Sequence, residues 1–250
     1  MTEKHLSSQF DAELNRVSAR VMELGGLVEA QLRTAVQALT SFSTEAVNQV
    51  VATEKRVNAL EVEIDYDLST IIARRQPTAR DLRLLIAFSK ATANLERMGD
   101  EAHKMARMVQ SIIDSGTALR ALPSGDLRVA AEMASELLRK TLDAFARLDT
   151  GAALSILKED DRIDTEFDSF VRTLITYMME DPRKISASLD LLFLAKAIER
   201  IGDHSKNIAE QVIYLVEGKD VRHQSVEQIV SMLQTPPAHE EVAPGADRGG

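Results

Sequence analysis

The sequence contains no cysteine and no tryptophan, and only 4% of its residues are aromatic. The absence of cysteine excludes disulfide bonds and thiolate metal sites, and nothing in the sequence points to an oxidising compartment. The segment MTEKHLSSQFDAELNR lacks the apolar stretch of a signal peptide. No later segment approaches the roughly 20 uncharged apolar residues that a membrane span needs. We therefore expect a cytoplasmic protein that does not cross a membrane.

Basic residues are outnumbered by acidic ones. The 250 residues include 30 Lys and Arg against 39 Asp and Glu, which gives a net charge of −9. Such a balance argues against a nucleic-acid-binding surface and leaves proteins, cations and small molecules as the expected partners. With 44% hydrophobic residues, the chain is long enough to bury a large core.

Glycine and proline are also scarce, with 11 and 6 residues. Ala, Leu, Glu, Arg and Met are abundant, which is typical of long helices and not of sheets. The few Pro, Gly, Ser and Asp residues gather at places where helices can begin or be capped. We predict helices at about 6–41, 44–75, 78–115, 125–149, 152–180 and 185–217. The later segment TPPAHEEVAPGADRGG predicts a disordered tail.

A five-residue motif occurs twice, as ERMGD at 96–100 and ERIGD at 199–203. The order of the surrounding segments is also repeated. EKRVN at 54–58 precedes the first copy, as DDRID at 160–164 precedes the second. A repeat of this length indicates a duplicated half-domain.

Steps of three and four residues from each motif reach mostly apolar or small residues. Such a series predicts the seam of a packed helix, with Gly and Ala allowing close approach of a neighbour. In the first half it is Phe88, Thr92, Leu95, Gly99, Ala102, Ala106, Val109 and Ile113; in the second it is Leu191, Ala195, Ile198, Gly202, Ser205, Ala209, Val212 and Val216. We therefore predict an all-α fold, a tandem repeat of two three-helix bundles with pseudo-twofold symmetry.

Paired acids flank both seams. The members of each pair, Glu96 with Asp100 and Glu199 with Asp203, are four residues apart and share one helix face. The two carboxylates of a pair therefore repel each other unless a cation lies between them. The preceding helices offer matching oxygen ligands, Glu54 and Asn58 in the first half and Asp160 and Asp164 in the second. Three or four converging oxygens per half predict a metal site completed by water.

Other interpretations of these residues stay open. Arg97 and Arg200 adjoin the acids, so a surface rim of ion pairs is the plainer alternative to metal. Glu61 and Asp65 repeat the spacing of four but have no clear counterpart in the second half. His103 shares the face of Glu96 and Asp100, but its counterpart is Lys206, which argues against a symmetric ligand.

An enzyme is the second class of function. Helical bundles with paired Glu-x-x-His motifs can hold two irons. Here the nearest match is the single segment Asp100-Glu-Ala-His103, and the second half has no histidine at the equivalent place. No phosphate-binding loop or nucleophile with a base partner is present. A metal-dependent hydrolase or oxidase using the same carboxylates remains the alternative to a non-enzymatic protein.

Several longer segments resemble the PhoU family of phosphate-transport regulators. They are GGLVEAQL at 25–32, RRQPTARDLRLL at 74–85, LERMGDEAHKMA at 95–106, YMMEDPR at 177–183 and AIERIGDHSKNIAE at 197–210. The resemblance spans residues 5–225. It implies two PhoU-type three-helix bundles at 1–120 and 121–220, followed by a largely disordered tail at 221–250.

The resemblance implies metal sites built from paired ExxxD motifs. Here these are Glu96 with Asp100 and Glu199 with Asp203, supported by Glu54, Asn58, Asp160 and Asp164. Because Asn58 is neutral where the second half has Asp164, we expect the first site to bind metal more weakly or with fewer ions. All-oxygen ligation leaves iron, zinc, manganese and magnesium as candidate ions.

The resemblance also implies a function. It indicates a cytoplasmic negative regulator of the phosphate-starvation response, which modulates phosphate uptake and is not an enzyme. The implied partners are a second copy of the chain, the ATPase subunit of the phosphate importer, and a membrane sensor histidine kinase. Contact with the membrane would be indirect, through these partners.

Overall fold

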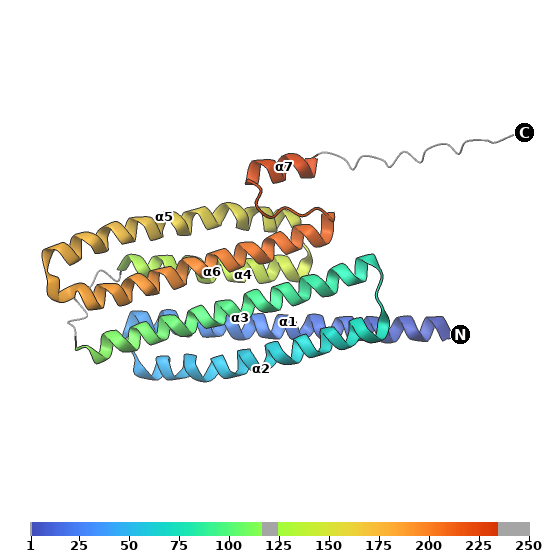
Figure 1. The fold of residues 1–250 in the computed structure, drawn as a ribbon, viewed down its shortest axis with the longest axis horizontal. Coiled ribbons are helices and arrows are strands. Elements are labelled where there is room, and N and C mark those ends of the chain that lie inside the picture. The colour runs from blue at the N-terminus through green and yellow to red at the C-terminus, as the bar shows by residue number, and fades with distance from the viewer. Residues whose placement is uncertain (1, 117–124, 235–250) are drawn as a thin grey trace, which may run out of the picture.

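The computed structural model describes residues 2–116 and 125–234, and these form long helices lying side by side (Figure 1). The helices are α1 (Thr2–Ser41), α2 (Thr44–Arg75), α3 (Ala79–Asp114), α4 (Gly125–Arg147), α5 (Thr150–Glu180), α6 (Ile185–Glu217) and α7 (Val226–Gln234), with a short 3-10 turn, η2 (Pro182–Lys184), before α6. The first begins earlier than the predicted residue 6. Every other predicted end of the six long helices differs by at most two residues.

Polar residues and glycine define several of these helix ends. The Ser43 hydroxyl accepts a hydrogen bond from the Ala46 amide at 3.3 Å, and the Asp149 carboxylate accepts one from the Ala152 amide at 2.9 Å. Both residues therefore satisfy an amide that the first turn of a helix leaves free. Gly218 ends α6 with a φ of 71°, a conformation that glycine adopts without strain.

The helices form two bundles of three. α1, α2 and α3 pack against one another, α4, α5 and α6 do the same, and α3 packs along α6 to join the halves. Side-chain contacts across α3 and α6 pair rising residue numbers with falling ones, so the two helices are antiparallel, as a twofold relation between two copies requires. They are Asn94 with Asn207, Glu101 with Arg200, and Ser111 with Asp190. The predicted tandem of three-helix bundles is confirmed.

The predicted seams are buried along nearly their whole length. Seven of the eight positions in each half are buried, and the apolar ones belong to a core shared by all six long helices. The last predicted positions differ, because Ile113 is half-buried and Val216 is 46% exposed. Val216 lies in the final turn of α6, one residue before the helix ends.

Residues 221–234 belong to the segment predicted as a largely disordered tail, but they include α7. Val221 and Ile229 are buried, α7 contacts α5, and the Lys219 ammonium donates to the Met232 carbonyl at 2.8 Å. The apolar spacing of VEQIVSML accounts for the helix. The rest of the expected tail lies outside the described residues. Within the described ranges, no helix is both long enough and apolar enough for a membrane span.

Candidate metal centres

In the first bundle, a carboxylate of α2 lies against a glycine of α3. Glu54 is only 6% exposed, and one of its oxygens accepts a hydrogen bond from the Gln31 amide at 2.8 Å. A Cβ placed on Gly99 would lie 3.1 Å from the Gln31 side-chain oxygen, 3.1 Å from Val57 Cγ1 and 3.5 Å from Glu54 Oε2. The glycine of ERMGD thus makes room for a polar pair on the neighbouring helices.

The second bundle repeats this arrangement more tightly. Asp160 of α5 is 1% exposed, and a Cβ on Gly202 would lie 2.7 Å from its Oδ1. The Lys206 ammonium lies 3.3 Å from Asp160 Oδ2. The structure therefore brings the acidic residue of the preceding helix to each repeated motif, as the sequence predicted.

Both buried carboxylates have oxygen atoms that lack hydrogen-bond donors. Among the described residues, Glu54 Oε1 and Asp160 Oδ1 are buried and accept no hydrogen bond. A buried carboxylate oxygen without a donor is costly, and a cation is one way to satisfy it. The donor set is all oxygen, which suits a hard metal ion. The residues present therefore fit a metal chemically.

The acids of the first bundle repel one another. Burial raises the pKa of Glu96, and the nearby charges of Asp100, Glu61 and Glu54 raise it further, while Arg97 lowers it. Burial also raises the pKa of Glu61, with further contributions from Asp65 and Asp100. The carboxylates from α2 and α3 therefore share one electrostatic environment, which a cation would stabilise.

The second bundle gathers four carboxylates in the same way. Burial raises the pKa of Asp160 to about 6, although Lys206 opposes the shift. Burial and then the charge of Glu199 raise the pKa of Asp164, and burial and then Asp164 raise that of Asp203. All four predicted acids of this half thus interact.

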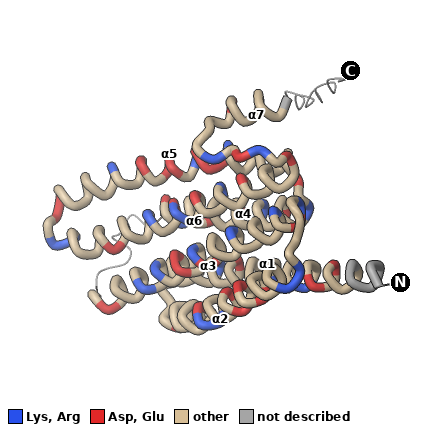
Figure 2. Tube along the Cα trace, turned by 45° about the vertical axis from the view of Figure 1, so that its right-hand side comes forward, with Lys and Arg blue, Asp and Glu red and all other residues tan. Residues whose placement is uncertain are grey.

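The predicted ligands differ in exposure. Glu54 and Asp160 are buried, Glu96, Asp100 and Glu199 are half-buried, and Asn58, Asp164 and Asp203 are exposed. Within the described residues, no three His, Cys, Asp or Glu side chains stand in a ligating arrangement. The metal sites therefore remain a prediction. Binding would require the exposed side chains to turn toward Glu54 and Asp160. Figure 2 shows acidic positions along α2, α3 and α5, with basic positions among them on α3 and α6.

Sequence reasoning missed the role of Lys196 in the second bundle. The Lys196 ammonium pairs with the Glu199 carboxylate at 2.5 Å and lies 5.3 Å from the centre of the Phe167 ring. Aligning the two repeats residue by residue would have shown Lys196 against Ala93.

Among the described residues, neither Arg97 nor Arg200 forms an ion pair with a motif acid, as the alternative of an ion-paired rim would require. Arg200 donates instead to Glu101, at 3.2 Å across the α3–α6 contact, and Lys104 donates to the same carboxylate at 2.8 Å. Glu101 is only 4% exposed. In the same contact, burial and the charge of Arg97 lower the pKa of His204 to about 4, so this histidine is neutral at physiological pH.

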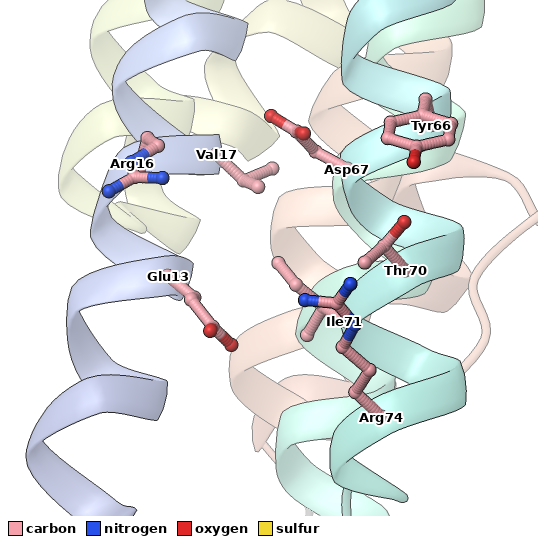
Figure 3. Close-up of a pocket in the computed structure, with 8 residues that line it drawn as sticks. All are labelled: Glu13, Arg16, Val17, Tyr66, Asp67, Thr70, Ile71 and Arg74. Carbon is pink, nitrogen blue, oxygen red and sulfur yellow. The ribbon is translucent and has the colours of Figure 1, made fainter.

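A separate groove of about 220 Å³ lies between α1 and α2 (Figure 3). It is lined by Glu13, Arg16, Val17, Tyr66, Asp67, Thr70, Ile71 and Arg74. Its two carboxylates are already paired, since Arg75 donates two hydrogen bonds to Glu13 and Arg20 pairs with Asp67 at 2.7 Å. These ion pairs therefore join α1 to α2, and both carboxylates that line the groove are already paired.

Known proteins match the chain across both bundles. The family model described as the PhoU domain matches residues 21–109 and again residues 127–212. A phosphate-specific transport system accessory protein PhoU homolog from Burkholderia sp is 49% identical over 92% of this chain and 97% of the relative. The phosphate-specific transport system accessory protein PhoU of Escherichia coli (strain K12) is 42% identical over 92% of this chain and 94% of its own.

Solved structures agree. The crystal structure of PhoU from Pseudomonas aeruginosa aligns with a TM-score of 0.81 at 42% identity, covering 84% of this chain and all of that one. That of the phosphate transport system regulatory protein PhoU from Streptococcus pneumoniae aligns with a TM-score of 0.77 at 26% identity, covering 85% and 99%. These proteins are described as accessory and regulatory proteins, and not as enzymes.

Proposed function

Because the chain belongs to the PhoU family, we propose that it is an accessory protein of the phosphate-specific transport system and a negative regulator of the phosphate-starvation response. The observation that carries the proposal is the double match of the family model, which covers both three-helix bundles. The enzyme alternative is set aside, because the relatives along the whole chain are accessory and regulatory proteins.

The proposed regulator acts in the cytoplasm by docking. Its partners are the ATPase subunit of the phosphate importer and a membrane sensor histidine kinase, and it reaches the membrane only through them. The description of the relatives as transport system accessory proteins supports the first partner. The net charge of −9 favours protein partners over nucleic acid.

Metal binding is the second part of the proposal. Glu54, Asn58, Glu96 and Asp100 would hold an ion between α2 and α3, and Asp160, Asp164, Glu199 and Asp203 would hold one between α5 and α6. A bound iron, zinc, manganese or magnesium ion would supply positive charge to acids that otherwise repel one another. Two observations support this role. Glu54 and Asp160 lie close to the motif glycines Gly99 and Gly202, and each has a buried oxygen without a hydrogen-bond donor.

A homodimer completes the proposal. Large apolar side chains are exposed on α5 and at the start of α6, and an exposed apolar patch favours a protein contact. They are Ile175, Met179, Ile185, Leu189 and Phe193, with Met179 80% exposed. Light scattering should give a mass near twice the 27.6 kDa of one chain. A mass near 27.6 kDa at micromolar concentration would contradict the dimer.

Co-purification tests the docking function. The tagged protein should recover the importer ATPase and the sensor kinase from cells grown at high and low phosphate. Replacing Glu96 and Asp100 with Gln and Asn should weaken recovery if the acidic clusters contribute to docking. The matched control is Glu132→Gln with Glu136→Gln on α4, an exposed acidic pair at the same spacing of four residues. Failure to recover either partner in any condition would contradict the proposal.

A further inference from the structure

Two polar pairs face each other across the α3–α6 contact, and only one of them is an ion pair. Arg200 of α6 donates to Glu101 of α3 at 3.2 Å. Because the two helices are antiparallel, Arg97, four residues before Glu101, lies opposite His204, four residues after Arg200. The His204 ring fits this register, since its Nδ1 lies 3.1 Å from the Oδ1 of Asn94, one turn before Arg97.

The repeat relates these two pairs to each other. The motifs are 103 residues apart (199 − 96), so Arg200 corresponds to Arg97 and His204 corresponds to Glu101. The twofold relation therefore turns the Glu101–Arg200 pair into the pair of His204 with Arg97, in which a histidine replaces the acid. Because this histidine is neutral at physiological pH, Arg97 lacks the carboxylate that Arg200 has.

Arg97 presents its guanidinium on the surface. Its side chain is exposed, and the ion pairs formed among the described residues do not include it. Lys104 and Arg200 lie along the same contact, and both bind the buried carboxylate of Glu101, while 48% and 50% of their own side chains stay exposed. Three cations thus share one buried acid, so the middle of this contact is positive.

The imidazole of His204 lies in these positive surroundings. Burial lowers its pKa most, and the charge of Arg97 lowers it further. Arg200 and Lys104 act in the same direction, against the opposing charge of Glu101. All three cations therefore lie close enough to act on one ring at the centre of the α3–α6 contact.

We propose that Arg97, Lys104 and Arg200 form a central basic face that docks an acidic segment of a partner protein, with a partner carboxylate binding Arg97. This inference rests on the proposed docking function. Charge complementarity carries it, because the partner carboxylate would stand beside Arg97 as Glu101 stands beside Arg200. The planar guanidinium suits a carboxylate, which it binds through two hydrogen bonds.

An acidic protein segment fits this face better than nucleic acid or an anionic membrane does. The basic face is small, and the chain as a whole carries a net charge of −9. An extended polyanion would therefore meet repulsion around the face, whereas a short acidic segment would contact the three cations alone.

Biolayer interferometry with the full chain tests the assignment. The probes are the purified ATPase subunit of the importer and the detergent-solubilised full-length sensor kinase. Arg97→Gln should weaken the binding of at least one probe about tenfold or more, because a hydrogen bond between charged groups is lost. The matched control is Arg56→Gln on α2, an exposed arginine that also has no ion pair among the described residues, and it should leave binding unchanged.

A carboxylate supplied by the chain itself should compete with the partner. His204→Glu restores the acid that the twofold relation leaves out, so it should pair with Arg97 and weaken binding about as much as Arg97→Gln does. His204→Gln should leave binding unchanged, which separates loss of the ring from gain of the charge. Circular dichroism checks that each variant is folded, and Arg97→Gln decides alone if His204→Glu is not.

The outcomes separate this inference from the proposed function. Wild-type binding that Arg97→Gln leaves unchanged, or that Arg56→Gln weakens equally, would overturn the basic face while leaving the docking function intact. Binding to phosphatidylglycerol vesicles that requires Arg97, without an effect of Arg97 on either protein probe, would assign the face to a membrane and also overturn the inference. A wild-type chain that binds neither protein probe would overturn both the face and the proposed docking function.

Discussion

Gly99 and Gly202 occupy the same place in the two repeats, and each lies against a carboxylate of the neighbouring helix. The sequence predicted close helix packing at these glycines. The structure shows that the close neighbours include the polar side chains of Gln31, Glu54 and Asp160. The motif glycine is therefore part of the acidic cluster and not only of the apolar seam.

Alanine substitutions test this role. Gly202→Ala should lower the free energy of unfolding by about 1 to 2 kcal/mol, because the new Cβ meets buried Asp160 at 2.7 Å and overpacking outweighs the gain in helix propensity. Gly99→Ala, with contacts of 3.1 Å, should cost less. Gly26→Ala is the control, because its Cβ would meet nothing within 4 Å, and it should gain up to about 1 kcal/mol. Urea denaturation measures all three, and a Gly202 variant as stable as the Gly26 variant would contradict the account.

The buried carboxylate of Asp160 makes stability depend on pH. Its pKa is about 6 in the folded protein, above the ordinary 3.8, so the folded state binds the proton more tightly than the unfolded state does. Its contribution is therefore full below about pH 4 and is lost as the pH rises through 6. At pH 8 the loss is on the order of 3 kcal/mol.

Asp160→Asn should remove this dependence. In metal-free buffer we expect the variant to gain stability over wild type at pH 8 and to gain little or nothing at pH 4, because the amide cannot ionise. The loss of the Lys206 ion pair reduces the gain. Denaturation at both pH values measures the difference. A variant that is equally destabilised at both would show that the ionised carboxylate is already well satisfied.

At the scale of elements, the contact between α3 and α6 joins the two bundles through a buried acid. Glu101 accepts hydrogen bonds from Lys104 and Arg200. Glu101→Gln should cost about 1 to 3 kcal/mol, because it removes charge-assisted hydrogen bonds from a buried position. Glu136→Gln, which removes an exposed ion pair with Arg139, should change stability little. Equal effects in urea denaturation would mean that the polar contact does not stabilise the pairing of the halves.

Helix positions could be predicted because local chemistry determines them. Ser43, Asp149 and Gly218 cap or end helices through their own side chain or backbone conformation, so their effect is visible in the sequence. The seams were visible because buried positions recur at helical spacing. α7 was missed because it is short and its apolar residues adjoin a segment rich in Pro, Gly and acids.

The electrostatics of the site could be predicted only in part. The meeting of Glu54 with Gly99 and of Asp160 with Gly202 followed from the repeat. The partners of Lys196 did not, because its long side chain can reach several neighbours and sequence spacing alone does not select one. For the same reason Arg200 could not be assigned to Glu101 in advance.

For the whole molecule, two copies of one bundle share a fold but differ in how their acids are balanced. Within the described ranges, the acids of the first motif pair with no lysine, whereas in the second bundle Lys196 pairs with Glu199 and Lys206 with Asp160. If metal binds and the apo clusters repel, the folded state gains free energy from metal that the unfolded chain cannot gain. The metal-free protein should then be measurably less stable than the loaded one.

Thermal unfolding of EDTA-treated protein with and without manganese, iron or zinc tests this claim most directly. At a metal concentration of about 100 times the dissociation constant, the midpoint should rise by on the order of 5 to 10 °C. Glu96→Gln with Asp100→Asn should remain folded without metal, at least as stable as wild type because the repulsion is gone, and should lose the part of the rise that the first site supplies. The control Glu132→Gln with Glu136→Gln should keep it. An unchanged midpoint in every metal, or an equal rise in the Glu96 and Asp100 variant, would contradict the account.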